Sequence, residues 1–212
     1  MKRILLFLIS FTLNLSVFYR IECVAQPSDS YTVWLLPSVQ YKVSESVVCA
    51  LQPGWNPQLS IGLLYANATV KVNRWMNINI GYLFLDLPRQ NNNEWTLMNG
   101  ITLKTHLNKF SIDYQNLIWN RFRSIHESYH FDRNRFRLFH ELTIHKLTVN
   151  PYLFEECWFY LNNKNISRNR TGMGVLFTIK RRYTLDLLYT RQWDRFDGDS
   201  SVLFFRSALF IN

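Results

Sequence analysis

Hydrophobic and polar residues alternate one by one along most of this chain. In residues 135–144 (RFRLFHELTI), the even-numbered positions are mostly apolar and the odd-numbered positions mostly polar. Residues 77–84, 96–104 and 170–180 follow the same rule with a few exceptions. Successive side chains of a β-strand point to opposite faces, so this period of two predicts strands with one apolar and one polar face. Most of these segments lack the three- and four-residue spacing of an amphipathic helix.

Eleven segments are predicted as strands, and most have the roughly 9 to 11 residues that a tilted strand needs to cross a bilayer. They span residues 31–42, 46–53, 60–70, 76–87, 94–106, 110–122, 134–146, 148–160, 168–180, 183–194 and 201–211. The pattern predicts an all-β fold, an antiparallel transmembrane barrel. Because bacterial single-chain barrels have an even number of strands, we expect about 12, with 10 as the second choice.

The predicted connections alternate between short turns and longer polar stretches. The short ones are residues 71–75, 107–109 and 181–182, and the longer ones are residues 88–93, 124–134, 162–167 and 195–200. Outer-membrane barrels have short periplasmic turns and longer external loops. The last strand follows a long connection, so the C-terminus is expected on the periplasmic side. A soluble β-sandwich, which does not require this alternation, is the competing architecture.

The start of the chain predicts an export signal. Lys2 and Arg3 precede an apolar run, and Cys23 and Ala25 are small residues placed for cleavage after Ala25. We therefore expect a signal peptide over residues 1–25 and a single barrel domain over residues 26–212. An uncleaved anchor and, because of Cys23, a lipoprotein are the alternatives. No later stretch reaches 18 consecutive apolar residues, which argues against further membrane helices.

Composition is compatible with a barrel and adds a basic character. The chain is 48% hydrophobic with a mean hydropathy of −0.13, an average that alternating lipid-facing and lumen-facing residues produce. Cleavage would remove three cations and one anion, which lowers the net charge from +9 to about +7. The basic residues are spread along the chain, so outer-membrane lipids and lipopolysaccharide are expected partners and nucleic acid is not.

Oligomeric state is left open. The two cysteines after the signal do not form a disulfide framework.

Several short motifs occur in an order typical of one barrel family. They are Trp34, Gly81-Tyr82, Arg135-Phe136-Arg137, Pro151-Tyr152, Glu155-Glu156, Arg168 and Arg170 before Gly172 and Gly174, and the run from Leu185 to Trp193. In this order they resemble a family of Gram-negative outer-membrane barrels known as domain of unknown function 2490. The resemblance implies an export signal, an antiparallel barrel and an outer-membrane location, without a reaction to transfer. The barrel-assembly machinery is an expected partner. Barrels of this kind often end on an aromatic residue that the assembly machinery recognises, whereas this chain continues two residues past Phe210.

Residues 126–130 match the zinc-peptidase motif H-E-x-x-H, with His126, Glu127 and His130 in the ligand and base positions. That motif needs a helix, whereas these residues lie in a polar connection, so we interpret them as an external loop. Asp194, Asp197 and Asp199 lack the spacing of a calcium loop and indicate a turn. No metal or other cofactor is therefore expected.

Polar faces that point inward would place seven charged residues in the lumen. The expected lumen ionic network consists of Asp113, Arg121, Arg137, Glu141, Glu156, Arg170 and Asp186. Such residues either fill a narrow barrel with salt bridges or form a charged constriction, and we favour a mainly filled interior. The expected role is a structural barrel or passive, porin-like small-solute pore. A lipid-modifying barrel enzyme, suggested by His106, His140 and His145, is the alternative.

Aromatic residues recur along the predicted strands and indicate girdles at the two membrane interfaces. The candidates are Trp75, Trp95, Trp119, Trp158, Trp193, Tyr82 and Tyr189.

Overall fold

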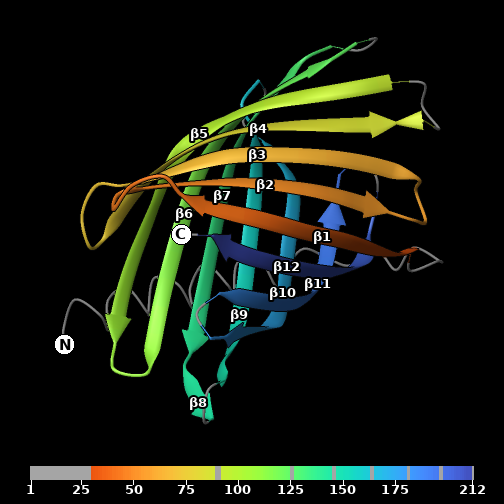
Figure 1. Cartoon of the computed structure of the whole chain (residues 1–212). Coiled ribbons are helices and arrows are strands. Elements are labelled where there is room, and N and C mark those ends of the chain that lie inside the picture. Colours follow the sequence, from red (N-terminus) through yellow and green to blue (C-terminus); the bar gives the residue numbers. More distant parts are fainter. Residues whose placement is uncertain are drawn as a thin grey trace.

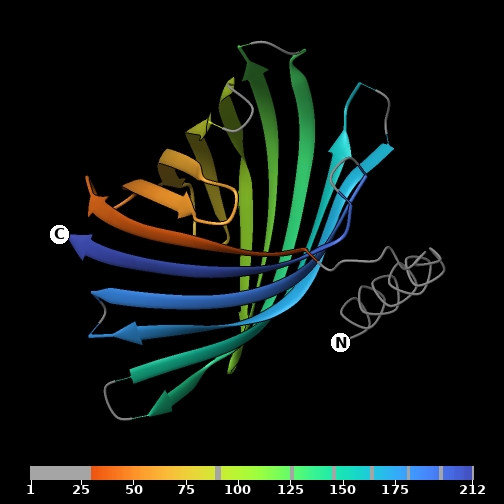
Figure 2. The same cartoon turned by 90° about the vertical axis from the view of Figure 1, so that its right-hand side faces the viewer.

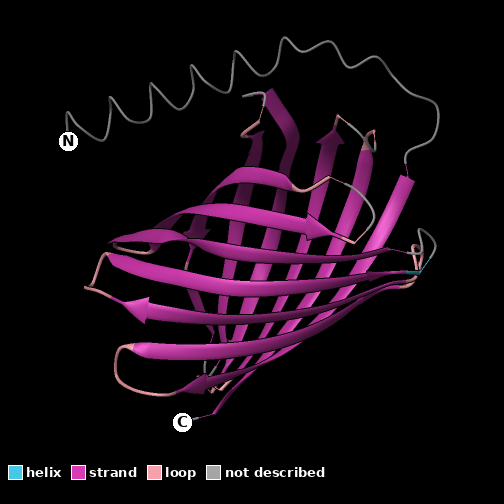
Figure 3. Cartoon of the chain, turned by 90° about the horizontal axis from the view of Figure 1, so that it is seen from above, coloured by secondary structure: helices cyan, strands magenta, loops and turns pink. Residues whose placement is uncertain are grey.

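The computed structural model describes residues 30–211 apart from residues 89–91, 125–126, 145–146, 163–164, 181 and 196–197, so the predicted signal peptide over residues 1–25 lies outside the described part. Strands make up the described part almost entirely (Figure 3). In chain order (Figure 1) they are β1 (Ser30–Lys42), β2 (Val47–Asn56), β3 (Ile61–Lys71), β4 (Met76–Leu87), β5 (Asn92–Leu107), β6 (Phe110–Arg123), β7 (Tyr129–His140), β8 (Leu142–Ile144), β9 (Leu147–Tyr160), β10 (Asn165–Ile179), β11 (Tyr183–Asp194) and β12 (Ser200–Ile211). Among the described residues, no helix is long and apolar enough to span a membrane.

These strands form one closed, transmembrane β-barrel. Each strand pairs with the next, β9 pairs with β10, and β12 returns to β1. The short β8 pairs with β9 just beyond β7, so β7 and β8 occupy the same position in the wall. The 12 predicted strands are therefore present as elements, while the closed wall has 11 positions.

Closure between β1 and β12 is parallel, whereas all other neighbours in the wall are antiparallel. Ser30 lies opposite Ser200 and Tyr41 opposite Ile211. Figure 2 shows both arrowheads pointing the same way. Strands that alternate in direction bring the first and last strands into the same direction when their number is odd. An even number of strands predicts a fully antiparallel wall. This prediction is wrong at the contact between β1 and β12, which is parallel.

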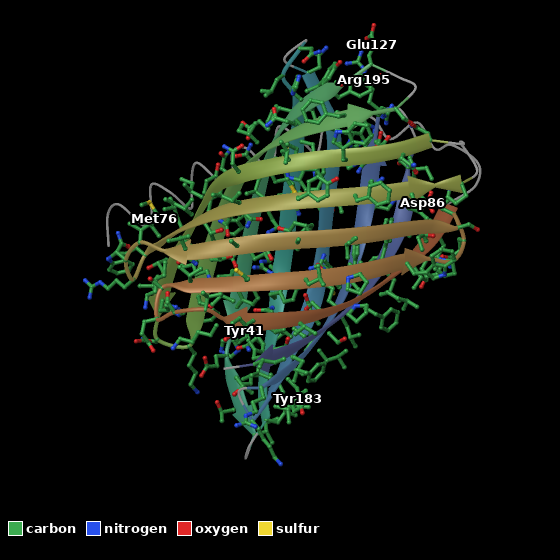
Figure 4. The ribbon with its side chains drawn as sticks, turned by 45° about the horizontal axis from the view of Figure 1, so that its top comes forward. Tyr41, Met76, Asp86, Glu127, Tyr183 and Arg195 are labelled. Atoms are coloured by element: carbon green, nitrogen blue, oxygen red, sulfur yellow. The ribbon has the colours of Figure 1, made fainter. Side chains whose placement is uncertain are left out.

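The barrel has two rims, which we call the turn rim and the loop rim. The turn rim carries the connections after β1, β3, β5, β8 and β10, and the loop rim carries those after β2, β4, β6, β9 and β11. Figure 4 labels Tyr41, Met76 and Tyr183 near the turn rim and Asp86, Glu127 and Arg195 near the loop rim. The last strand ends at the turn rim, which is the side predicted from the connection lengths.

The predicted difference in connection length is much reduced in the structure. The longest connections at the loop rim contain five residues, 124–128 and 195–199, while those at the turn rim contain two to four. The predicted loop 124–134 is shortened because β7 already begins at Tyr129. Polar residues in this stretch predict a loop, but those from residue 129 onward belong to β7. Among them, Arg133 faces the lumen.

The outer surface of the wall is apolar. Ile80, Leu153 and Met173 are 58%, 58% and 64% exposed. Exposed apolar side chains on every side are unfavourable in water, whereas a bilayer solvates them. The period of two read from the sequence is thus the alternation between the lipid-facing and lumen-facing sides of the wall.

Aromatic residues form part of this outer surface, and two of the predicted girdle residues do not. Trp75, Trp95, Trp193, Tyr82 and Tyr189 are all exposed on the outside. The other two, Trp119 and Trp158, are buried in the lumen, where their rings contact each other edge to face with centroids 4.6 Å apart. The residues on either side of each tryptophan face outward, and the alternation along β6 and β9 therefore places Trp119 and Trp158 on the lumen side.

One polar group interrupts the apolar outer surface on β6 and β7. Asn116 donates hydrogen bonds to Asp132 (2.6 Å) and Asn134 (3.1 Å) across the two strands, and the Tyr114 hydroxyl also donates to Asn134. These mutual hydrogen bonds reduce the cost of placing polar groups on a lipid-facing wall.

Candidate functional site

The lumen contains a cavity of about 540 Å³, and its charged lining is entirely cationic. Among the described residues that line it there is no carboxylate. The cations come mainly from β6, β7 and β10, whose polar positions alternate inward. They are Lys104, Arg121, Arg133, Arg135, Arg137, Arg168, Arg170 and Arg206.

Glu156 on β9 neutralises two of these arginines from behind the cavity surface. It is fully buried, and its Oε2 accepts hydrogen bonds from Nε (2.8 Å) and Nη2 of Arg133. Its Oε1 accepts from Arg170 (3.1 Å) and from the indole of Trp158 (2.8 Å). Both oxygens are thus occupied, which is what a carboxylate needs in order to remain charged away from water.

Asp113 on β6 has a similar relation to Arg137 on β7. The two residues lie opposite each other in the register, and the guanidinium donates through Nε and Nη2 to the two carboxylate oxygens at 3.0 and 2.5 Å. On the facing side, Arg206 pairs with Asp186 at 3.3 Å, and Asp186 also accepts a hydrogen bond from Tyr152 at 2.7 Å.

Further pairs lie toward the loop rim. Glu94 pairs with Arg123 at 2.5 Å and with Arg121 at 3.6 Å, and Arg168 pairs with Asp194. Because these carboxylates are also almost completely buried, the pairs fill the lumen here and do not expose negative charge to the cavity.

Arg135 differs from the other cavity arginines. It lies on β7 between Arg133 and Arg137, and the carboxylates nearest to it are Glu156 and Asp113. Their oxygens are used by the neighbouring arginines. The Nε of Arg135 is shielded and has no hydrogen-bond partner in the described part of the chain. The strand therefore presents one guanidinium whose charge is not matched.

Aromatic and aliphatic side chains pack together inside the loop half of the lumen. Trp119, Phe131 and Trp158 contact one another and pack with Leu83, Met98 and Leu117, all of them buried. The inward residues nearer the turn rim, among them Gln40 and Asn67, are only half-buried. The packed cluster therefore fills part of the loop half of the lumen, and half-buried polar residues line the turn half.

The wall that faces the arginines is uncharged. Most inward positions of β1 to β4 near the turn rim are amides and hydroxyls, with Val48 and Ala50 as apolar members: Ser38, Gln40, Gln52, Asn67, Thr69, Asn77 and Asn79 are the polar ones. Some are hydrogen-bonded to one another, as in the series from Thr69 to Asn79 (3.3 Å) and from Asn79 to Thr102 (2.8 Å). The cavity thus has a cationic side and a neutral, hydrogen-bonding side.

Most of the charged residues expected in the lumen are located there. Six of the seven, namely Asp113, Arg121, Arg137, Glu156, Arg170 and Asp186, form the ion pairs described above. Glu141 is the exception, since it lies in the break between β7 and β8 and is exposed. The alternation that carries the other positions inward ends at that break.

Sequence reasoning missed several members of this site. Arg133 lies in a predicted loop, Arg168 and Glu94 lie at predicted strand ends, and Arg206 lies inside a predicted strand without being a predicted site residue. Arg135 was recognised on the polar face of its strand but not as a site residue. Residues 131–137 (FDRNRFR) lack apolar–polar alternation, and arginine at every second position, 133, 135 and 137, is the signal that points to a longer strand.

The H-E-x-x-H segment does not form a helix in its described part. Tyr129 and His130 belong to β7, and the His130 ring nitrogen Nδ1 is 3.0 Å from Oδ1 of Asn120. Glu127 lies at the loop rim, and His126 is outside the described residues. The helical geometry of a zinc peptidase is therefore not present around His130.

The other candidate chemical groups are separated from one another. Asp194 pairs with Arg168 and Asp199 with Arg191, while Asp197 lies outside the described residues.

The histidines that suggested an enzyme are likewise apart. His106 is exposed at the turn rim opposite Ser111, His140 stacks on Phe110, and His145 lies outside the described residues. No hydrogen bond joins a serine to a histidine in the part that the structure describes, so a nucleophile and base pair is not assembled there.

Comparison with known proteins gives one family and one fold. A model of the family described as "Protein of unknown function (DUF2490)" matches residues 10–202. The solved structure of LpxR from Salmonella typhimurium is similar with a TM-score of 0.50 and 8% identity, covering 77% of this chain and 83% of that chain. Identity this low shows a shared fold alone. A search of curated protein sequences gives no match.

Proposed function

The chain belongs to the DUF2490 family of proteins of unknown function, and we propose from its lumen geometry that it is an outer-membrane barrel that binds a small anion. The observation that carries this proposal is the cavity of about 540 Å³ whose eight charged lining residues are all cationic. A volume of this size is typical of small-molecule sites.

Electrostatics favour an anion in this cavity for a specific reason. The carboxylates that neutralise the arginines are buried behind them, so the field inside the cavity is set by the guanidinium groups at its surface. A concave site lined by one sign of charge concentrates ions of the opposite sign. Guanidinium groups also match carboxylate and phosphate geometry through two parallel hydrogen bonds.

Binding fits the lumen better than passive conduction. Barrels of 8 strands are filled by side chains and those of 16 leave an aqueous channel, so a wall of 11 positions leaves the outcome to the side chains. The packed Trp119, Phe131 and Trp158 lie across the loop half. The solute would therefore enter and leave at the turn rim, which we place on the periplasmic side.

Calorimetric titration of the refolded, detergent-solubilised barrel tests this function. Inorganic phosphate is expected to bind and choline, a cation of similar size, is not; binding should weaken as sodium chloride screens the charges. Planar bilayers provide the second measurement, in which the correctly folded barrel should give no open-pore current. Absence of phosphate binding, or a large ohmic conductance, would contradict the proposal.

Location is tested separately in cells. We propose that the apolar outer wall contacts outer-membrane lipids and lipopolysaccharide after insertion by the barrel-assembly machinery. The protein should fractionate with the outer membrane and change its gel mobility on heating. Recovery in the aqueous periplasmic fraction would exclude this location.

A further inference from the structure

The two sides of the cavity together indicate a narrower class of ligand. We propose that the lumen binds a hydroxylated anion of the sugar-acid or sugar-phosphate type, with its anionic group on Arg135 and a hydroxyl donated to Asn67. This inference rests on the proposed anion-binding function and adds the identity of the ligand class.

Arg135 is suited to hold the anionic group because its own protein does not neutralise it. Arg133 and Arg137 lie two residues away on the same face of β7, and their like charges act on Arg135 from both sides. Glu156 and Asp113 have their oxygens engaged by those neighbours. An incoming carboxylate or phosphate would supply the missing negative charge and an acceptor for the Nε of Arg135.

Asn67 provides the second contact from the opposite wall. Its side-chain oxygen Oδ1 is shielded from solvent and lacks a hydrogen-bond partner among the described residues. Asn67 and Tyr65 face the lumen from the same strand, β3, and the charges of Arg133 and Arg135 reach Tyr65 across the cavity. A shielded acceptor without a partner is costly. A ligand that carries a hydroxyl donor would satisfy it.

An orphaned donor and an orphaned acceptor therefore line one cavity from facing walls. A bare inorganic anion satisfies the donor at Arg135 but offers Asn67 a donor only if it is protonated. An anion with hydroxyl groups along a carbon chain or ring satisfies both contacts at once. The amides and hydroxyls near Asn67 extend this match, because each amide side chain both donates and accepts hydrogen bonds.

An amphiphilic anion with an alkyl tail fits this cavity less well. The leucines of the lumen are engaged with one another and with aromatic rings: Leu83 and Leu117 belong to the packed cluster around Trp119, and Leu36 packs with Phe204 and Tyr152. Near Asn67 an alkyl chain would contact Ala50 and Val48, but it would also cover amide groups that lose their hydrogen bonds to water.

Gluconate and hexanoate form a matched pair of probes, because both are six-carbon monocarboxylates and only gluconate carries hydroxyls. Calorimetry on the full refolded barrel should give at least tenfold tighter binding for gluconate. Glucose 6-phosphate should also bind more tightly than inorganic phosphate. Equal affinity for gluconate and hexanoate, with phosphate binding retained, would overturn the ligand class and leave the anion-binding function intact. If the natural protein binds none of these anions, both the anion-binding function and the ligand class are overturned.

Variants assign the two contacts. Arg135→Gln should weaken phosphate and gluconate at least tenfold, whereas Asn67→Leu should weaken gluconate and leave phosphate unchanged. Arg74→Gln, at an exposed arginine beside Trp75, is the control for the charge lost in Arg135→Gln. Asn67→Thr keeps an acceptor at position 67 and should recover part of the gluconate affinity lost in Asn67→Leu. Heat-modifiable gel mobility verifies folding, and Arg135→Lys, which keeps the charge, replaces Arg135→Gln if that variant does not fold. Unchanged gluconate binding in folded Arg135 and Asn67 variants would overturn the assignment.

Discussion

Arg137 on β7 and Asp113 on β6 form a bidentate ion pair across two neighbouring strands, and this pair determines the electrostatics of Arg135 two residues away. Each oxygen of Asp113 accepts one hydrogen bond from Arg137, at 3.0 and 2.5 Å, and none from Arg135 within the described part of the chain. On the other side of Arg135, Glu156 accepts hydrogen bonds from Arg133, Arg170 and Trp158. The fixed ion pairs of the lumen thus leave a defined position for an external anion.

Asp113→Asn should destabilise the barrel, because it leaves the charge of Arg137 unmatched inside the lumen. Breaking a buried ion pair by removing one partner costs about 3 to 5 kcal/mol. Urea unfolding in liposomes measures the loss. The double variant Asp113→Asn with Arg137→Gln removes both charges and should recover much of it, and a double variant no more stable than the single one would contradict this account.

Gly174→Ala should also lower stability, for a steric reason. Gly174 lies opposite Tyr152, and a Cβ at this position would be 2.4 Å from Cζ of that ring. The ring would have to move away from its hydrogen bond to Asp186, and overpacking of this kind costs about 1 to 3 kcal/mol. Gly62→Ala is the matched control, since its nearest atom is 3.9 Å away. Equal unfolding midpoints for the two variants would refute the prediction.

The parallel seam predicts a specific cross-linking pattern. Val39 lies opposite Leu209, and Leu203 is six residues away along β12, about 20 Å at the rise of a strand. A short bifunctional thiol reagent should therefore link Val39→Cys with Leu209→Cys and not with Leu203→Cys. The free cysteines Cys49 and Cys157 are first replaced by serine. Preferential linkage to position 203 would indicate the opposite strand direction.

Glu45 in the turn after β1 should titrate below its ordinary range. Its carboxylate accepts a hydrogen bond from Lys42 at 2.8 Å, and this bond and the lysine charge lower the pKa of Glu45 from its ordinary 4.5. A lowered folded-state pKa gives a stabilising contribution that is present above the unfolded pKa and is lost as the pH falls through the folded pKa. Carboxyl NMR titration should show the pKa returning toward 4.5 in Lys42→Gln or at high salt. An identical pKa of Glu45 in the natural protein and in Lys42→Gln would show that Lys42 does not lower it.

Much of the wall was readable from local alternation. The segment from Arg135 to His140 is a strand with Arg137 inward, and Asp113 and Glu156 are inward as predicted. Such positions follow from the period of two, because a strand in a membrane barrel has one side in lipid and the other in the lumen. The same rule misplaced Glu141, where the strand breaks, and the loop assignment of Arg133 failed because loop and lumen-facing residues are both polar.

The sequence by itself determined the barrel class and the inward direction of most charged residues, since both depend on alternation between neighbours along the chain. Tertiary structure alone decided the parallel pairing of Ser30 with Ser200, the inward position of Trp158 and the hydrogen bonds that engage Glu156 and Asp113 with arginines other than Arg135. Those features depend on register between strands far apart in the chain. Alternation fixes which face a side chain is on, but only closure of the barrel fixes which side chains meet across the lumen.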